Sequence, residues 1–79
     1  MIQKYTVTAE GEGRLDILSR ISMLFMQRHI DVESLTYKPH GDAGSKYEVC
    51  ALATEETVSK VVSQMKHIEG LNNINYNRN

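Results

Sequence analysis

The sequence predicts an α+β domain in which one four-stranded antiparallel sheet carries two helices on a single face. Two observations support this fold class. Apolar residues recur at a helical period in residues 15–28 and 55–68, and they alternate with polar residues in four shorter stretches. The resulting order is β-α-β-β-α-β, and two amphipathic helices need one half-buried sheet to cover their apolar faces.

The first strand and the first helix occupy the N-terminal third of the chain. Residues 3–9, QKYTVTA, alternate between apolar and polar side chains, as a half-buried strand does. The helix follows over residues 15–28, and we expect it to begin near Gly13 or Asp16, although neither is an ideal N-cap. Its apolar residues lie on one stripe: Ile17, Leu18, Ile21, Leu24 and Phe25.

The second strand, residues 30–39, has an irregular pattern. Val32 and Leu35 are three positions apart, which breaks strict alternation, and a β-bulge near Glu33–Ser34 would return both side chains to one face. Pro39 either closes the strand or marks a sheet edge, because proline cannot donate a ladder hydrogen bond.

A turn, a third strand, a second helix and a last strand complete the chain. HGDAG, residues 40–44, predicts the turn, and residues 45–53 alternate again. Thr54 is a good N-cap for the second helix, and Gly70 is placed to end it before a short strand at 71–76. The inward-facing residues of the third strand and second helix are apolar: Tyr47, Val49, Ala51, Ala53, Val58, Val61, Val62 and Met65.

These elements make one domain over residues 1–79, with the ferredoxin-like arrangement and its first and third strands in the middle. A core this small gives a net stability of roughly 3–5 kcal/mol, so we expect a homodimer or a larger partner. The outward face of the first helix suits a contact with another chain, although exposed methionines are also ordinary in small domains. It carries Leu15, Ser19, Ser22, Met23 and Met26.

Composition and charge exclude several classes of protein. A net charge of −1 gives no electrostatic reason to expect binding to nucleic acid or to an anionic membrane. No apolar stretch is long enough to span a bilayer, and the N-terminus lacks the features of a signal peptide. A single cysteine excludes an internal disulfide. A cytoplasmic protein is the simplest interpretation.

The sequence singles out no catalytic or metal site. His29, His40 and His67 have no metal-ligand spacing, and His29 falls at the end of the first helix, where a cation is favourable. Cys50 has no apparent His or Asp partner and is expected to pack as a small residue. No pair of carboxylates suggests acid–base chemistry, and the third strand lacks the aromatic row of an RNA-recognition sheet.

The glycine-containing loop before the first helix, AEGEGR from Ala9 to Arg14, is the most informative segment. Such loops often bind phosphate. Here Glu10, Glu12 and Asp16 surround the loop and no lysine follows, so the carboxylates would repel a phosphate. We therefore expect the GEG segment to be a turn that needs positive φ or close backbone approach. A ligand with its own ammonium group, such as an amino acid, fits the charge better.

Residues 17–37 resemble a known family. The helix contains Leu18-Ser19-Arg20 and, one turn further on, Leu24-Phe25; after Arg28 the second strand reads Asp31-Val32-Glu33-Ser34-Leu35-Thr36. This segment resembles the start of the regulatory small subunits of acetolactate synthase (acetohydroxyacid synthase), whose second strand reads Asn-Ile-Glu-Ser-Leu-Thr. The match extends more loosely over the whole chain. That family belongs to the ACT domains, amino-acid-sensing modules of β-α-β-β-α-β topology.

The resemblance implies a single ACT domain over residues 1–79 that acts as a regulatory subunit, with no catalytic residue, metal or cofactor of its own. Its partner would be the large catalytic subunit, which carries thiamine diphosphate, Mg²⁺ and FAD and condenses pyruvate with a second 2-keto acid. Small subunits raise that activity, and many make it sensitive to feedback by valine. This chain resembles the short form with one ACT domain.

The resemblance also implies where an effector would bind. The site comprises the loop, the helix start and, from a second copy, the start of the second strand: Gly11, Glu12, Gly13, Asp16, Ile17 and Asp31. Effector-binding members carry Asn, Gly and Asn where this chain has Gly13, Asp16 and Asp31. Gly13 lacks a side-chain amide, and Asp16 would repel the carboxylate of an amino acid at a cost of about 1–4 kcal/mol. We therefore expect a degenerate site that binds valine weakly or not at all.

We expect a homodimer in which the first helices or the second strands of two chains meet. Its interface residues would be Leu15, Ser19, Met23, Met26 and Leu35. Two other functions stay open. A free-standing ACT domain could sense another amino acid, with Asp16 and Asp31 holding the ammonium group. A small enzyme of the same fold, such as an acylphosphatase, would need a catalytic Arg–Asn arrangement, which nothing in the sequence singles out.

Overall fold

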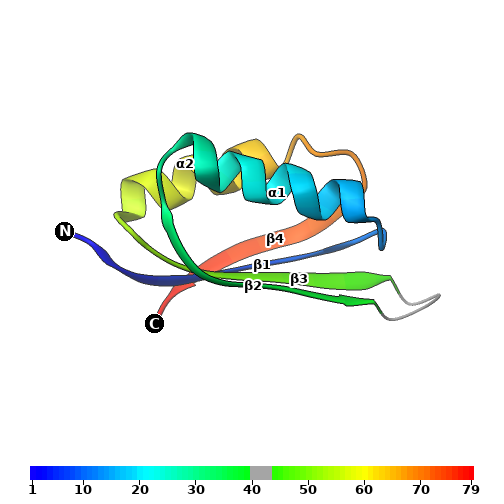
Figure 1. Cartoon of the computed structure of the whole chain (residues 1–79), viewed down its shortest axis with the longest axis horizontal. Coiled ribbons are helices and arrows are strands. Elements are labelled where there is room, and N and C mark those ends of the chain that lie inside the picture. Colours follow the sequence, from blue (N-terminus) through cyan, green and yellow to red (C-terminus); the bar gives the residue numbers. More distant parts are fainter. Residues whose placement is uncertain (40–43) are drawn as a thin grey trace.

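The computed structural model describes residues 1–39 and 44–79, and it confirms the predicted fold class. The elements are β1 (Gln3–Gly11), α1 (Leu15–Gln27), β2 (Asp31–Pro39), β3 (Ser45–Ala53), α2 (Glu55–Met65) and β4 (Leu71–Arg78). The sheet has the order β2-β3-β1-β4, every neighbouring pair is antiparallel, and both helices cover one face (Figure 1). β1 and β3 lie in the middle, as predicted. Of the turn predicted at 40–44, residues 40–43 lie outside the described residues.

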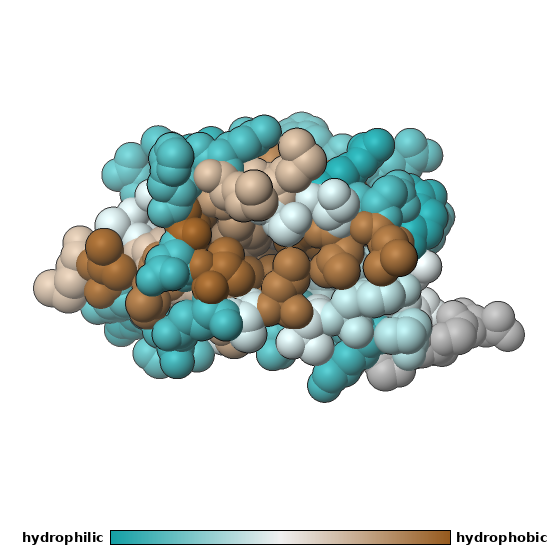
Figure 2. Space-filling view, viewed as in Figure 1, coloured by the Kyte–Doolittle hydropathy of each residue, from teal (hydrophilic) through white to brown (hydrophobic). Residues whose placement is uncertain are grey.

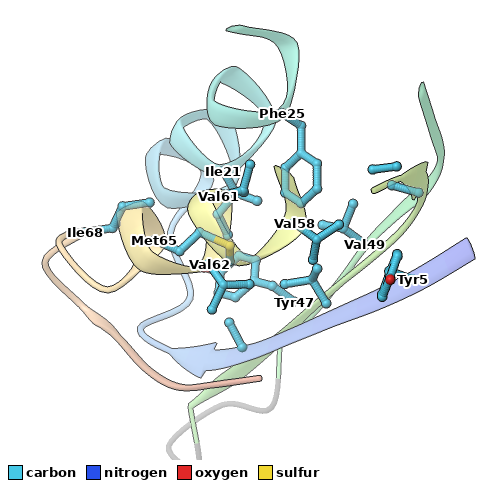
Figure 3. Packing of buried hydrophobic residues seen from close by; sticks show 14 of the residues in the cluster. Tyr5, Ile21, Phe25, Tyr47, Val49, Val58, Val61, Val62, Met65 and Ile68 are labelled. Carbon is cyan, nitrogen blue, oxygen red and sulfur yellow. The ribbon is translucent and has the colours of Figure 1, made fainter. Parts of the chain in front are cut away.

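The core lies between the sheet and the two helices. In Figure 3 the side chains of α1, α2, β1 and β3 point toward one another, as the two sequence periods predict. The buried apolar residues are Tyr5, Val7, Ala9, Ile17, Ile21, Phe25, Tyr47, Val49, Ala51, Ala53, Val58, Val61, Val62, Met65 and Ile68. The helical stripe of α1 also includes Leu18 and Leu24, which are only partly buried.

The predicted β-bulge in β2 is confirmed. The pairing of β2 with β3 shifts between Val32 and Ser34, so that Val32 lies opposite Ala51 and Leu35 lies opposite Val49. Because Ala51 and Val49 face the helices, the bulge places Val32 and Leu35 on the helix side of the sheet. The strand lies at the sheet edge and ends at Pro39, so the missing N–H falls on the last pair of the ladder with β3.

The ends of α1 differ from the prediction. The N-cap is Arg14, rather than Gly13 or Asp16, and its side chain makes no capping hydrogen bond. At the other end His29 has a φ of 54°, and the N–H groups of His29 and Ile30 donate to the carbonyls of Met26 (3.0 Å) and Phe25 (3.1 Å). This is a Schellman motif with histidine at the left-handed position, where glycine is usual.

The start of α2 matches the prediction, whereas its end does not. The N–H of Thr57 donates to Thr54 Oγ1 at 3.2 Å, which confirms the predicted N-cap. The helix ends at Met65, and Gly70, with a φ of 97°, lies in the turn that enters β4 and does not end the helix. In the part of the chain that the structure describes, no helix is long and apolar enough to cross a membrane.

Candidate functional site

The loop between β1 and α1 is anchored by close backbone contact. The N–H of Glu12 donates to the carbonyl oxygen of Gly70 at 2.9 Å. A Cβ atom on Gly11 would overlap that same carbonyl oxygen, so no other residue fits there without a shift of the backbone. The prediction that the GEG segment is a turn requiring close backbone approach is therefore confirmed.

Tyr47 of β3 is hydrogen-bonded to the backbone of this loop. Its hydroxyl donates to the carbonyl oxygen of Glu12 at 2.6 Å, and the N–H of Arg14 donates to the same hydroxyl oxygen at 3.3 Å. Tyr47 is almost fully buried, and burial raises its pKa above the usual value near 10. The N–H of Arg14, which an anionic ligand would need as a donor, thus already donates to a side chain of β3.

The charges of the loop are largely paired with one another. The guanidinium of Arg14 donates to Asp16 from Nε (3.0 Å) and Nη2 (3.3 Å), and its Nη1 lies 2.8 Å from Glu12 Oε2. The hydrogen bond to Asp16 raises the pKa of Arg14 above its usual value. Glu10 lies apart from this group and accepts a hydrogen bond from Asn73 Nδ2 at 2.7 Å.

This pairing changes the charge argument made from the sequence. Glu12 and Asp16 were expected to act as uncompensated carboxylates, but Arg14 lies between them and offsets one of the two charges. Repulsion of a ligand carboxylate is therefore weaker than the sequence indicates. At the same time a ligand ammonium would have to displace Arg14, because its guanidinium already binds the carboxylates of Glu12 and Asp16.

Gly13 is constrained by residues that are remote in sequence. A Cβ atom at this position would overlap Ser45 Oγ and would lie 2.9 Å from the hydroxyl of Tyr37. Ser45 is buried and Tyr37 is half-buried, so neither can withdraw freely. An Asn at position 13, as effector-binding ACT domains carry, does not fit this loop as it stands.

The structure brings together Gly11, Glu12, Gly13 and Asp16, the predicted effector residues of the loop and helix start. Ile17 follows them, but its side chain is fully buried in the core. Asp31 lies at the other end of the sheet: it pairs with Leu52 of β3, whereas Gly11 pairs with Ser45. Seven positions separate Ser45 and Leu52, or roughly 23 Å at 3.3 Å per residue. Asp31 can reach the loop only from a second copy of the chain.

The predicted interface residues of α1 and β2 are all exposed, and Val32, which was not predicted, is exposed on the same strand as Leu35. We define the apolar strip as Leu15, Met23, Met26, Val32 and Leu35, all of which are exposed large hydrophobic residues. Ser19 is exposed among the α1 members. Figure 2 shows apolar side chains gathered along this side of the molecule, over α1 and the neighbouring edge of the sheet. An exposed apolar surface of this kind is typical of a protein contact.

Sequence reasoning missed Arg14, Tyr47, Tyr37 and Ser45 as parts of the site. Arg14 carried a local signal, because it stands two positions from each of Glu12 and Asp16. The other three come from β2 and β3, and no local pattern places them under the loop. Among residues 1–39 and 44–79, no group of three His, Cys, Asp or Glu side chains is placed to hold a metal ion.

Comparisons with known proteins support the fold but identify no family for this chain. No protein-family model matches the sequence, and no curated protein matches it either. The C-terminal domain of the MgtC protein from Mycobacterium tuberculosis is similar in structure, with a TM-score of 0.82 and 14% identity over 99% of this chain and 88% of that one.

Two further structures show how widely this fold is used. The ACT domain of GTP pyrophosphokinase from Chlorobium tepidum has a TM-score of 0.79 and 6% identity over 98% of this chain and 100% of that chain. Acylphosphatase from Bacillus subtilis, an enzyme, has a TM-score of 0.71 and 17% identity over 100% and 86%. The chain thus has an ACT-like fold, and at these identities the likeness concerns the fold alone.

Proposed function

We propose that this chain is the non-catalytic regulatory subunit of an acetolactate synthase, acting in branched-chain amino-acid biosynthesis. The observation that carries the proposal is the segment from Leu18 to Thr36, which resembles the small subunits of that enzyme and forms α1 and β2. The ACT-like fold supports it. The thiamine diphosphate, Mg²⁺ and FAD of the reaction belong to the large catalytic subunit, and the small subunit raises its activity.

The decisive experiment measures acetolactate formation by the cognate large subunit with and without an excess of this chain. We expect no activity from this chain alone and a rate several times higher with both subunits. As a control, Val58→Asp tests whether activation needs the folded chain, because that change places an unpaired charge in the core. An unchanged rate with the natural chain would contradict the proposal.

The regulatory unit would be a homodimer formed through the apolar strip and the β2 edge. Within residues 1–39 and 44–79, β2 is an edge strand whose outer side a second β2 can extend. Charge favours a second copy as the occupant: antiparallel self-pairing centred between Ser34 and Leu35 brings Asp31 of one copy opposite Lys38 of the other. The same arrangement carries Asp31 toward the loop of the other copy, where the predicted effector site needs it.

The loop supports a weak or absent response to valine. An amino acid requires donors for its carboxylate and acceptors for its ammonium, and here Arg14, Glu12 and Asp16 already bind one another. Asp16→Asn should release the guanidinium of Arg14 to a ligand carboxylate and give measurable valine binding by isothermal titration. Glu56→Gln, an exposed carboxylate in the first turn of α2, is the matched control. A low micromolar dissociation constant for valine with the natural chain would contradict the proposed weak response.

The second candidate is a free-standing ACT-like domain that senses a different amino acid. An excess of acceptors at the loop favours it: Glu12 and Asp16 share one guanidinium, and Asp31 of a second copy would add a third carboxylate for a ligand ammonium. Titration with a panel of amino acids separates the two candidates. Tight binding of one of them, together with no effect on the large subunit, would favour the sensor.

A further inference from the structure

Two stacked tyrosines join the sheet edge to the candidate effector loop. Tyr37 of β2 lies directly opposite Tyr47 of β3, and their rings stack with centroids 5.2 Å apart and planes inclined by 20°. Tyr47 is buried and Tyr37 is half-buried at the edge. An aromatic pair of this kind has a defined geometry, so a movement of one ring displaces the other.

Both rings also contact the loop. The hydroxyl of Tyr47 bonds with the carbonyl of Glu12 and the N–H of Arg14. The hydroxyl of Tyr37 lies 2.9 Å from the position that a Cβ atom would take on Gly13. The loop is therefore in contact with Tyr37 of the edge strand and with Tyr47 of β3, although Tyr37 lies 24 positions after Gly13 in the sequence.

Within the described chain, no strand pairs with the outer edge of β2. β2 pairs with β3 on its other side. Val32 and Leu35 are each 37% exposed on its helix side. The position of Tyr37 thus depends on β3, on the core against which it packs, and on whatever covers the outer edge.

We propose that Tyr37 and Tyr47 couple the β2 edge to the effector loop, so that a second copy of this chain bound along β2 fixes the loop conformation. The inference rests on the homodimer in the proposed function and adds a route by which dimerisation reaches the loop. Both tyrosines are positioning residues: they act on the loop backbone and do not touch the effector. Asp31 of the second copy arrives at the loop that its own β2 has ordered.

Amide hydrogen exchange tests the coupling directly. The exchange of the Gly13 and Arg14 amides is measured on the full chain below and above the midpoint concentration of dimerisation, which sedimentation or light scattering supplies. We expect loop exchange to slow at least tenfold on dimerisation of the natural chain. In Tyr37→Leu, which keeps an apolar side chain but removes the stack, we expect a dimer whose loop exchange no longer depends on concentration.

Two further variants separate coupling from general stability. Tyr47→Phe keeps the stacked ring and removes the loop bonds, so loop exchange should be fast in monomer and dimer alike. Tyr76→Phe removes a hydroxyl on β4, which lies 3.5 Å from a Glu55 carboxylate oxygen, and should leave the tenfold slowing intact. A merely structural role would lower the unfolding midpoint of the variants without removing the concentration dependence.

Three outcomes would overturn the coupling. Equal slowing in the natural chain, Tyr37→Leu and Tyr47→Phe would show that the tyrosines transmit nothing. A dimer whose loop exchanges as fast as the monomer would remove the coupling and leave the homodimer standing. A chain that stays monomeric at all concentrations would remove both. Failure to activate the large subunit is a separate result, because exchange and dimerisation are measured without that subunit.

Discussion

The two βαβ halves of the domain share a topology but differ in what they leave exposed. In the half formed by β3, α2 and β4, the outward residues of α2 are polar, Thr54 caps its start, and Lys60 pairs with Glu56 at 3.2 Å. In the half formed by β1, α1 and β2, the helix start has no side-chain cap and the apolar strip faces outward. The outward side chains of α2 are therefore polar, whereas α1 and β2 leave large apolar side chains exposed.

The difference extends to the two sheet edges. β4 exposes Asn72, Asn73, Asn75 and Asn77, and Asn73 has a φ of 49° that interrupts the regular strand. Polar side chains and an irregular backbone discourage pairing with another chain. β2 instead exposes Val32 and Leu35 on its helix side. The β4 edge is therefore polar and irregular, whereas the β2 edge exposes two apolar side chains.

The largest expected effect comes from placing a charge in the apolar strip. Leu35→Asp would put two like carboxylates near the two-fold axis of the dimer, and an unpaired charge buried at an interface costs about 3 kcal/mol. We expect the dissociation constant of the dimer to rise at least a hundredfold by sedimentation. Asn75→Asp on the β4 edge is the matched control and should leave it unchanged. Equal effects of both changes would remove the distinction between the edges.

Removing the Tyr47 hydroxyl tests how the first half holds its loop. Tyr47→Phe leaves the Glu12 carbonyl and the Arg14 N–H without this partner, which should lower the free energy of unfolding by about 2 kcal/mol. Urea titration measures the change. Tyr76→Phe in the second half should cost far less, since its hydroxyl is 3.5 Å from Glu55 and exposed to water. If both variants lost the same stability, the hydroxyl of Tyr47 would have no special role.

Alkaline pH should reproduce part of this loss in the natural chain. Burial raises the pKa of Tyr47 in the folded state above its unfolded value near 10. The stabilisation from the neutral hydroxyl is therefore complete below about pH 10 and declines as the pH rises through the folded-state pKa. The stability difference between the natural chain and Tyr47→Phe should shrink over this range. A difference that stays constant up to pH 11.5 would contradict the assignment.

The smallest expected effect concerns a left-handed residue in each half. His29 and Gly70 both have positive φ, but only the second is glycine. His29→Gly removes the strain of a side chain at positive φ but raises the conformational entropy of the unfolded chain. We expect the free energy of unfolding to rise by about 0.5 kcal/mol. Gly70→Ala should instead destabilise, because its Cβ would lie 3.0 Å from Ile17 Cδ1. Thermal unfolding compares the two, and a loss of stability in His29→Gly would show that the imidazole makes a contact worth more than the strain.

Most of the fold could be predicted because its signals are local. Strict alternation in β1 and β3 marked the two central strands, and the three-residue step from Val32 to Leu35 indicated the bulge that the pairing of β2 shows. The cap at Thr54 was equally local. Helix ends were harder to predict, because His29 and Arg14 are poor terminating and capping residues whose positions depend on the packing around them.

The sequence by itself determined the element order, the buried faces and the family resemblance, since each depends on residue types at short spacing. Only the tertiary structure decided the state of the loop. Tyr37, Ser45 and Tyr47 lie under it because β2 and β3 pair in one register, and this register depends on contacts between distant parts of the chain. Arg14 was visible in the sequence, but its hydrogen bonds follow from a backbone that Gly11 and Gly70 bring together. Short-range patterns therefore set the fold, and long-range contact geometry set the site.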